Sequence, residues 1–134
     1  MLDHLDDAAF LARFERLEIP ARDFGHREHL RLAFVMLRDA DFGEGAVRFR
    51  AAFRRFTEAF GVTAKYHETL TWAYLALVAQ CIDERVYASS LALLADRPDL
   101  LDHQAGLLAR HYDVAAITAS PLARRVFVLP ARVR

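Results

Sequence analysis

The sequence AKYHETLTWAYLALVAQCID occupies residues 64–83 and is the most apolar long segment of the chain. Apolar residues recur in it at spacings of three and four, which is the period of an amphipathic helix. At about 100° per residue, His67 and Tyr74 fall on one apolar face, and Leu75 falls on a second. A helix with two apolar flanks contacts other elements on both sides. We therefore expect this helix at the centre of an all-helical domain.

Outside this segment, apolar residues keep the same spacing almost throughout, and only five Gly and four Pro interrupt them. We expect a first helix after Asp6 or Asp7 that ends before Pro20. Further helices are expected at about residues 26–38, 44–60, 64–83, 91–95 and 100–112, with a last short helix at Ser120-Pro121. The sequence predicts an all-α fold: a single domain over residues 1–134, a bundle of about five to six helices, and an extended C-terminal tail from Val126 to Arg134.

The charge of the chain is balanced, with 18 basic and 18 acidic residues and a formal net charge of +0. No basic field attracts nucleic acid or an anionic membrane, so we expect neither as a partner. No apolar stretch approaches the roughly 18 residues of a membrane span, and the N-terminus lacks the pattern of a signal peptide. The lone Cys81 cannot pair within the chain, which favours a cytoplasmic location.

Three histidines fall on core-facing stripes of the expected helices. His26 and His29 are three residues apart, so their side chains are neighbours on one helix face and can bind one ion. His67, at the start of the apolar face of 64–83, is the best-placed third ligand. Imidazoles suit Fe, Cu or Zn, and three of them leave coordination positions open for water, dioxygen or a substrate. The sequence therefore predicts a site for one divalent transition metal.

Residues beside these histidines supply candidate chemistry. Tyr66 and Glu68 flank His67 as candidate catalytic groups, with Glu68 as a base for hydrolysis and tyrosine as a partner for redox chemistry. Four further residues are expected to bind the substrate: Arg27, Arg31, Lys65 and Tyr74. In this interpretation, the protein is a small metalloenzyme that acts on a small organic substrate, as an oxidoreductase or a hydrolase.

Two metal-free alternatives stay open. In the first, His67 acts as a general acid or base beside Lys65, and Arg27 or Arg31 clamps an anionic or carbonyl substrate. Lys65 is conspicuous here because it is the only lysine among 18 basic residues. In the second, the histidines are hydrogen-bonded core groups of a ligand-binding or protein-interaction module. The apolar C-terminal segment is suited to a homodimer interface, and equally to packing within its own chain.

Two later histidines, His103 and His111, are eight residues apart in the expected helix 100–112. Their separation is a little over two turns, too far for both to bind one ion, so we expect surface or packing roles for them. The chain contains no GxSxG, HExxH or CxxC motif and no glycine-rich phosphate loop. Their absence leaves the first three histidines as the main chemical feature.

Two short segments carry a resemblance to a known family. FGHREHLR at residues 24–31 and KYHETLT at residues 65–71 resemble the two signatures of a family of small, uncharacterised bacterial all-helical proteins. The similarity continues through the C-terminal half and covers most of the chain. The resemblance implies that the neighbourhood of His26, His29 and His67 is the shared site, and it implies no particular substrate.

Overall fold

The computed structural model describes residues 2–131, and this part of the chain is all-helical, without a β-strand. The predicted all-α fold is confirmed. Residues 2–131 form eight α-helices: α1 (Asp7–Glu15), α2 (His26–Leu37), α3 (Phe42–Ala59), α4 (Glu68–Glu84), α5 (Ser90–Asp96), α6 (Pro98–Leu101), α7 (Val114–Ala119) and α8 (Pro121–Arg125). Three short 3-10 helices connect them: η1 (Ala21–Asp23), η2 (Thr63–Lys65) and η3 (Leu108–Arg110).

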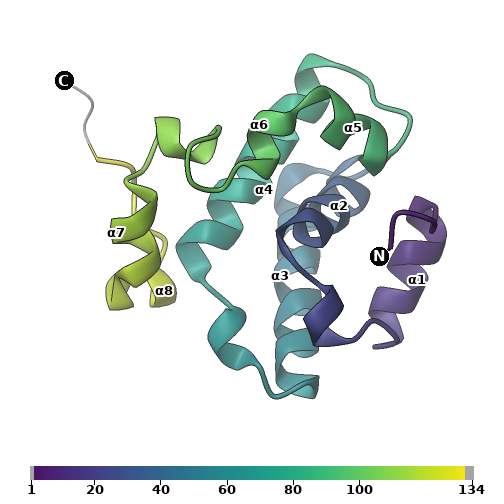
Figure 1. Ribbon diagram of the computed structural model, residues 1–134, viewed down its shortest axis with the longest axis horizontal. Helices are drawn as coiled ribbons and strands as arrows, with labels where there is room; N and C mark the ends of the chain where they lie inside the picture. Colours follow the sequence, from purple (N-terminus) through teal and green to yellow (C-terminus); the bar gives the residue numbers. More distant parts are fainter. Residues whose placement is uncertain (1, 132–134) are drawn as a thin grey trace.

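Helix α4 is the central element of the fold. It contacts α2 and α3 with one flank and the C-terminal elements α7 and α8 with the other (Figure 1). Leu75 and Val78 of α4 are buried, as are Leu30 of α2 and Phe53 of α3. The two apolar flanks of the 64–83 segment thus join the N-terminal helices to the C-terminal pair.

The expected helix over 100–112 does not form. Its place is taken by α6, a tight turn and η3. In the turn, the Leu107 N–H donates to the Asp99 carbonyl at 2.9 Å, which folds the chain back on itself. A Cβ atom on Gly106 would lie 2.1 Å from that carbonyl, so the turn requires glycine. This break is one reason why the described chain has more and shorter helices than the five to six predicted.

A buried arginine ties the N-terminus to the body of the fold. The Arg31 side chain has no exposed surface, and its Nε donates to the Ser90 hydroxyl at 2.9 Å. Its two terminal nitrogens donate to the carbonyls of Leu2 and Leu5, and one of them lies 3.3 Å from the Asp7 carboxylate. Arg31 therefore joins α1, α2 and α5.

A buried threonine at the start of α4 holds the C-terminal segment. The Thr69 hydroxyl shares its one hydrogen between the carbonyls of Ala123 and Val126, at 2.8 and 2.9 Å, and accepts from the Val128 N–H. Residues 126–131 continue without helix, as expected for the tail, and residues 132–134 of the predicted tail lie outside the described residues. Within residues 2–131, no helix combines the length and the apolar character that a membrane crossing needs.

Candidate functional site

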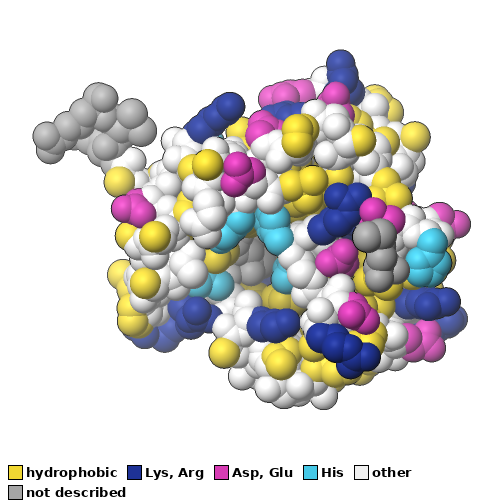
Figure 2. Space-filling view, in the orientation of Figure 1, with side chains coloured by type: hydrophobic (Ala, Val, Ile, Leu, Met, Phe, Trp, Pro, Cys, Tyr) yellow, Lys and Arg dark blue, Asp and Glu magenta, His cyan; other side chains and the backbone are white. Residues whose placement is uncertain are grey.

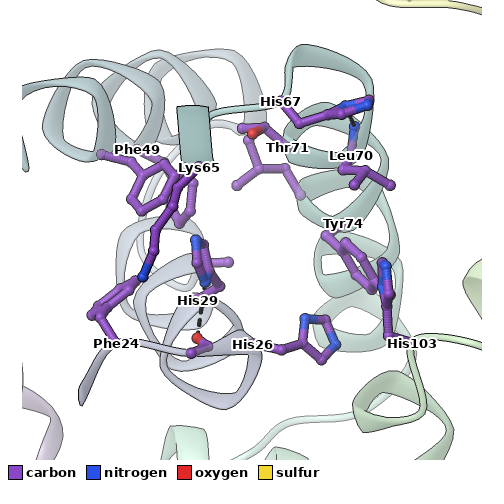
Figure 3. Close-up of a pocket in the computed structure, with 14 residues that line it drawn as sticks. Phe24, His26, His29, Phe49, Lys65, His67, Leu70, Thr71, Tyr74 and His103 are labelled. Atoms are coloured by element: carbon purple, nitrogen blue, oxygen red, sulfur yellow. Dashed lines mark hydrogen bonds between the residues drawn. The ribbon is translucent and has the colours of Figure 1, made fainter. Parts of the chain in front are cut away.

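A cavity of about 320 Å³ opens between α2, α4, η2 and the turn after α6. Histidine side chains gather around a hollow on the face of the molecule in Figure 2. The cavity walls are mainly apolar, with Phe24, Phe49 and Phe53 on one side. Its polar lining comes from four histidines together with Lys65, Thr71 and Tyr74 (Figure 3). Small organic ligands bind in cavities of this kind, with apolar walls and a few polar groups.

His29 lies in the first turn of α2, where the chain turns back after Gly25. Its Nδ1 donates to the Gly25 carbonyl at 2.8 Å, and its ring packs edge-on against Phe24 and Phe53. Burial lowers the pKa of His29 to about 4, so the ring is neutral at physiological pH. Because Nδ1 carries the proton, Nε2 is a hydrogen-bond acceptor on the cavity side of the ring (Figure 3).

His26, one position after Gly25, presents a second acceptor. Its Nε2 donates to the Leu100 carbonyl at 2.9 Å, which leaves Nδ1 without a proton in the neutral ring. Burial lowers the pKa of His26, and the nearby His103 acts in the same direction. The His26 ring packs against Tyr74, with 4.7 Å between ring centroids.

His103 is a lining residue that sequence reasoning missed. It was expected at the surface or in packing within a helix over 100–112, but α6 ends at Leu101 and the following turn brings His103 to the cavity. Its Nδ1 is hydrogen-bonded to the Tyr74 hydroxyl at 2.8 Å. Burial raises the pKa of Tyr74, so the phenol keeps its proton. His103 and Tyr74 are 29 residues apart, and no local spacing signals this contact.

His67 also lines the cavity, but both of its ring nitrogens are engaged. It is the N-cap of α4: Nδ1 accepts from the Leu70 N–H at 3.1 Å. Nε2 therefore carries the proton and donates to the Ile117 carbonyl of α7 at 3.0 Å. In this arrangement His67 fixes the start of α4 and docks α7, and neither nitrogen has a free lone pair.

The three predicted metal ligands thus border one cavity without forming a ligand cluster. Among residues 2–131, no group of three or more His, Cys, Asp or Glu side chains is arranged to hold a metal ion. A metal bound by His26, His29 and His67 requires the His67 ring to give up a hydrogen bond and turn. The three-histidine metal site therefore stays a prediction.

The candidate catalytic pair lies outside the cavity lining. The Glu68 carboxylate accepts hydrogen bonds from the Tyr66 hydroxyl and from Nε of Arg50. Burial opposes ionisation of Glu68, but these two donors hold its pKa below the ordinary value. Burial and the adjacent carboxylate raise the pKa of Tyr66 to about 12. The pair forms a network with α3 rather than with the histidines.

The four candidate substrate-binding residues divide into two pairs. Lys65 and Tyr74 line the cavity, whereas Arg27 and Arg31 do not. Arg27 forms an ion pair with Asp3 at 2.8 Å, and Arg31 is committed to the buried contacts described above. An anion clamp built from these two arginines is therefore not available to a ligand in the cavity.

Lys65 is the cationic side chain of the cavity. Its Nζ donates to the Ala21 carbonyl at 3.3 Å, and no carboxylate within residues 2–131 lies at ion-pair distance from it. Thr71 lines the cavity as well, and its hydroxyl makes no side-chain hydrogen bond to another residue of 2–131 (Figure 3). Both groups are available to a ligand.

The comparisons with known proteins do not extend this picture. No protein-family model matches the chain, and no curated protein or solved structure is significantly similar to it. The resemblance of residues 24–31 and 65–71 to a bacterial helical family stays a prediction. Any functional proposal therefore rests on the geometry of the cavity.

Proposed function

We propose that the chain binds a small organic molecule in the cavity between α2 and α4. The observation that carries this proposal is a set of polar groups that line an apolar cavity and have hydrogen-bonding capacity left over from their contacts within the protein. These groups are the Lys65 ammonium, the Thr71 hydroxyl and one nitrogen each of His26 and His29. Polar groups in apolar surroundings are normally hydrogen-bonded, so a ligand with matching groups gains from meeting them.

The dimensions and walls of the cavity support this proposal. A volume of about 320 Å³ is at the lower end of the range for organic-ligand pockets. Phe24, Phe49 and Phe53 offer flat apolar surface, which favours a ligand with an apolar or aromatic body. Because His29 stays neutral at physiological pH, its Nε2 accepts a hydrogen bond there and does not take up a proton.

A cavity-filling substitution tests the proposal. Thr71→Phe places a ring in the hollow, whereas Ala51→Phe adds the same group on the exposed outer face of α3. We expect a fragment library screened by thermal shift to give hits with the parent chain and with Ala51→Phe, and none with Thr71→Phe. Circular dichroism of each variant verifies the fold. Hits that persist in Thr71→Phe would place binding elsewhere and overturn the proposal.

The metalloenzyme remains the second proposal, because the three predicted ligands all border this cavity. Its test is elemental analysis of tag-free protein after reconstitution with zinc, iron and copper. About one ion per chain, lost in the triple variant His26→Ala, His29→Ala and His67→Ala, would support a metal site. The same ion content in parent and variant would overturn it.

A further inference from the structure

The lining of the cavity contains a cation and no carboxylate. Among residues 2–131, no Asp or Glu side chain lines it, whereas Lys65 does. The acidic residues beside it are already engaged. Glu28 accepts from the Gly25 N–H at 2.8 Å, and Glu68 is paired with Arg50 at 3.0 Å. A bound anion therefore meets the Lys65 cation and the Thr71 hydroxyl, and no carboxylate within the lining.

The cation and the aromatic walls lie next to each other. Lys65 extends from η2 along the wall of the cavity, and its ammonium lies on the side of Phe24 and His29 (Figure 3). Within the described part of the chain its one hydrogen bond is the long one to the Ala21 carbonyl, so its remaining donors are available. The Thr71 hydroxyl offers another donor from α4. The cavity thus has the Lys65 charge on one side and the apolar phenylalanine wall next to it.

We propose that the ligand is an aromatic monocarboxylate, with its carboxylate on the Lys65 ammonium and its ring against the phenylalanine wall. This inference rests on the proposed ligand-binding function and names the class of ligand. A carboxylate is favoured over a phosphate ester because one ammonium is present and no arginine lines the cavity. The flat walls of Phe49 and Phe53 favour an aromatic body over a branched aliphatic one.

Matched ligands test the charge requirement. Phenylacetate and phenylacetamide share one aromatic body and differ in charge, and acetate supplies the charge without the ring. We expect calorimetry to give phenylacetate about tenfold tighter binding than the amide, with acetate weaker still. Equal binding of acid and amide would overturn the carboxylate assignment and leave the proposed ligand site standing. Equal binding of acetate and phenylacetate would overturn the aromatic part.

Matched variants test the part played by Lys65. Lys65→Gln and Arg13→Gln each remove one exposed positive charge, but only the first lies at the cavity. We expect Lys65→Gln to abolish the preference for acid over amide and Arg13→Gln to retain it, with Lys65→Arg restoring part of it. An unchanged preference in Lys65→Gln would overturn the proposal. If other fragments bind but phenylacetate does not, only the proposed ligand class is overturned. If no fragment binds, the proposed function is overturned as well.

Discussion

His29 keeps an acceptor nitrogen in the cavity because its other ring nitrogen is committed to the backbone. The bond from Nδ1 to the Gly25 carbonyl fixes the tautomer, and the edge-on contacts with Phe24 and Phe53 fix the ring plane. A histidine held in this way loses little freedom when a ligand binds. Burial also keeps it neutral, since the charged ring would lose its hydration.

Because His29 is buried in its neutral form, we expect the stability of the fold to decrease at acid pH. The pKa of His29 is about 4 in the folded chain against an ordinary value of 6.5, so the unfolded chain binds more protons between these values. The contribution of neutral His29 to the free energy of unfolding is therefore complete above pH 6.5, and it is lost as the pH falls toward 4. We expect the contribution of His29 to the free energy of unfolding to fall by about 2 kcal/mol between pH 7.5 and 5.

Urea denaturation at both pH values measures this difference. His29→Phe removes the titrating group and keeps a ring, so its loss of stability between pH 7.5 and 5 is expected to be smaller than that of the parent. His4→Phe, at an exposed position, is the control and is expected to match the parent. Equal acid sensitivity in the parent and in His29→Phe would contradict the assignment.

Arg31 and Arg27 each form an ion pair with an aspartate, but Arg31 is buried and Arg27 is partly exposed. Replacing the buried Arg31 by Met removes the nearer of the two cations of Asp7, leaving Arg38 at 3.8 Å, and leaves two carbonyls without a donor, so we expect a loss of about 3–5 kcal/mol. Arg27→Met breaks a partly exposed ion pair with Asp3, with a loss below about 1 kcal/mol. Urea denaturation gives both values, and similar losses would refute a structural role for Arg31.

The site was only partly predictable at the residue scale. His26, His29 and His67 were placed near one another because helical periodicity put each on a core-facing stripe, and all three line the cavity. Periodicity gives a direction from the helix axis but not the partner that a polar side chain meets. It therefore gave no warning that His67 caps α4 or that Arg31 is wholly buried.

At the scale of elements, the start of α4 combines several tasks in a few residues. Residues 63–65 form η2 rather than the first turn of α4, because the His67 side chain caps the helix that begins at Glu68. Lys65 is therefore released from the helix and reaches the cavity. Two residues beyond the cap, Thr69 holds the C-terminal segment. The KYHETLT segment thus has two roles: it forms part of the cavity wall, and it holds α7 and α8 against α4.

Thr69→Val tests this docking role, since valine keeps the shape of threonine and removes the hydroxyl. The change leaves the carbonyls of Ala123 and Val126 and the Val128 N–H without their partner. We expect a loss of about 1–3 kcal/mol and faster hydrogen exchange over residues 121–128.

Thr118→Val is the matched control for Thr69→Val. The Thr118 hydroxyl donates to the Val114 carbonyl within α7 at 2.7 Å, so its loss affects one helix alone. Hydrogen exchange over residues 121–128 is expected to stay at the parent rate in this variant. If both substitutions accelerate exchange over 121–128 equally, the docking role assigned to Thr69 is wrong.

Element boundaries were predictable where local chemistry sets them. The caps at Asp6 and Ser120 form as expected, since each side chain accepts from a backbone N–H three residues later. The prediction of a helix over 100–112 was wrong, because the spacing of apolar residues does not reveal a turn that is held by a hydrogen bond between Leu107 and Asp99. That turn brings His103 to the cavity, so the missed element and the missed residue have one cause.

At the scale of the whole molecule, the cavity is lined by residues of α2, α3, η2, α4 and the turn after α6, and the C-terminal pair α7 and α8 packs on the other flank of α4 (Figure 1). The C-terminal segment presents apolar side chains on its outer side: Leu122, Val126, Phe127 and Leu129 are 54%, 52%, 41% and 74% exposed. Contiguous apolar surface of this kind is typical of interfaces, and it keeps the homodimer proposed from the sequence open to test.

Sedimentation velocity at rising protein concentration tests the dimer. We expect the parent chain to shift toward dimer mass, and the double variant Leu122→Asp and Leu129→Asp to stay monomeric, because two charges at a contact oppose burial. A parent chain that keeps monomer mass at every concentration would contradict the dimer. Val86→Asp, at a 94% exposed position outside the segment, controls for the change in charge.

The ligand cavity itself is tested most directly by NMR of the histidine rings. Four of the six histidines line the cavity, and the exposed His4 and His111 do not. With ¹³C-labelled histidine and a fragment that stabilises the protein, we predict that the ring signals of His26, His29, His67 and His103 shift together while those of His4 and His111 stay in place. Shifts confined to His4 or His111 would contradict a ligand site between α2 and α4.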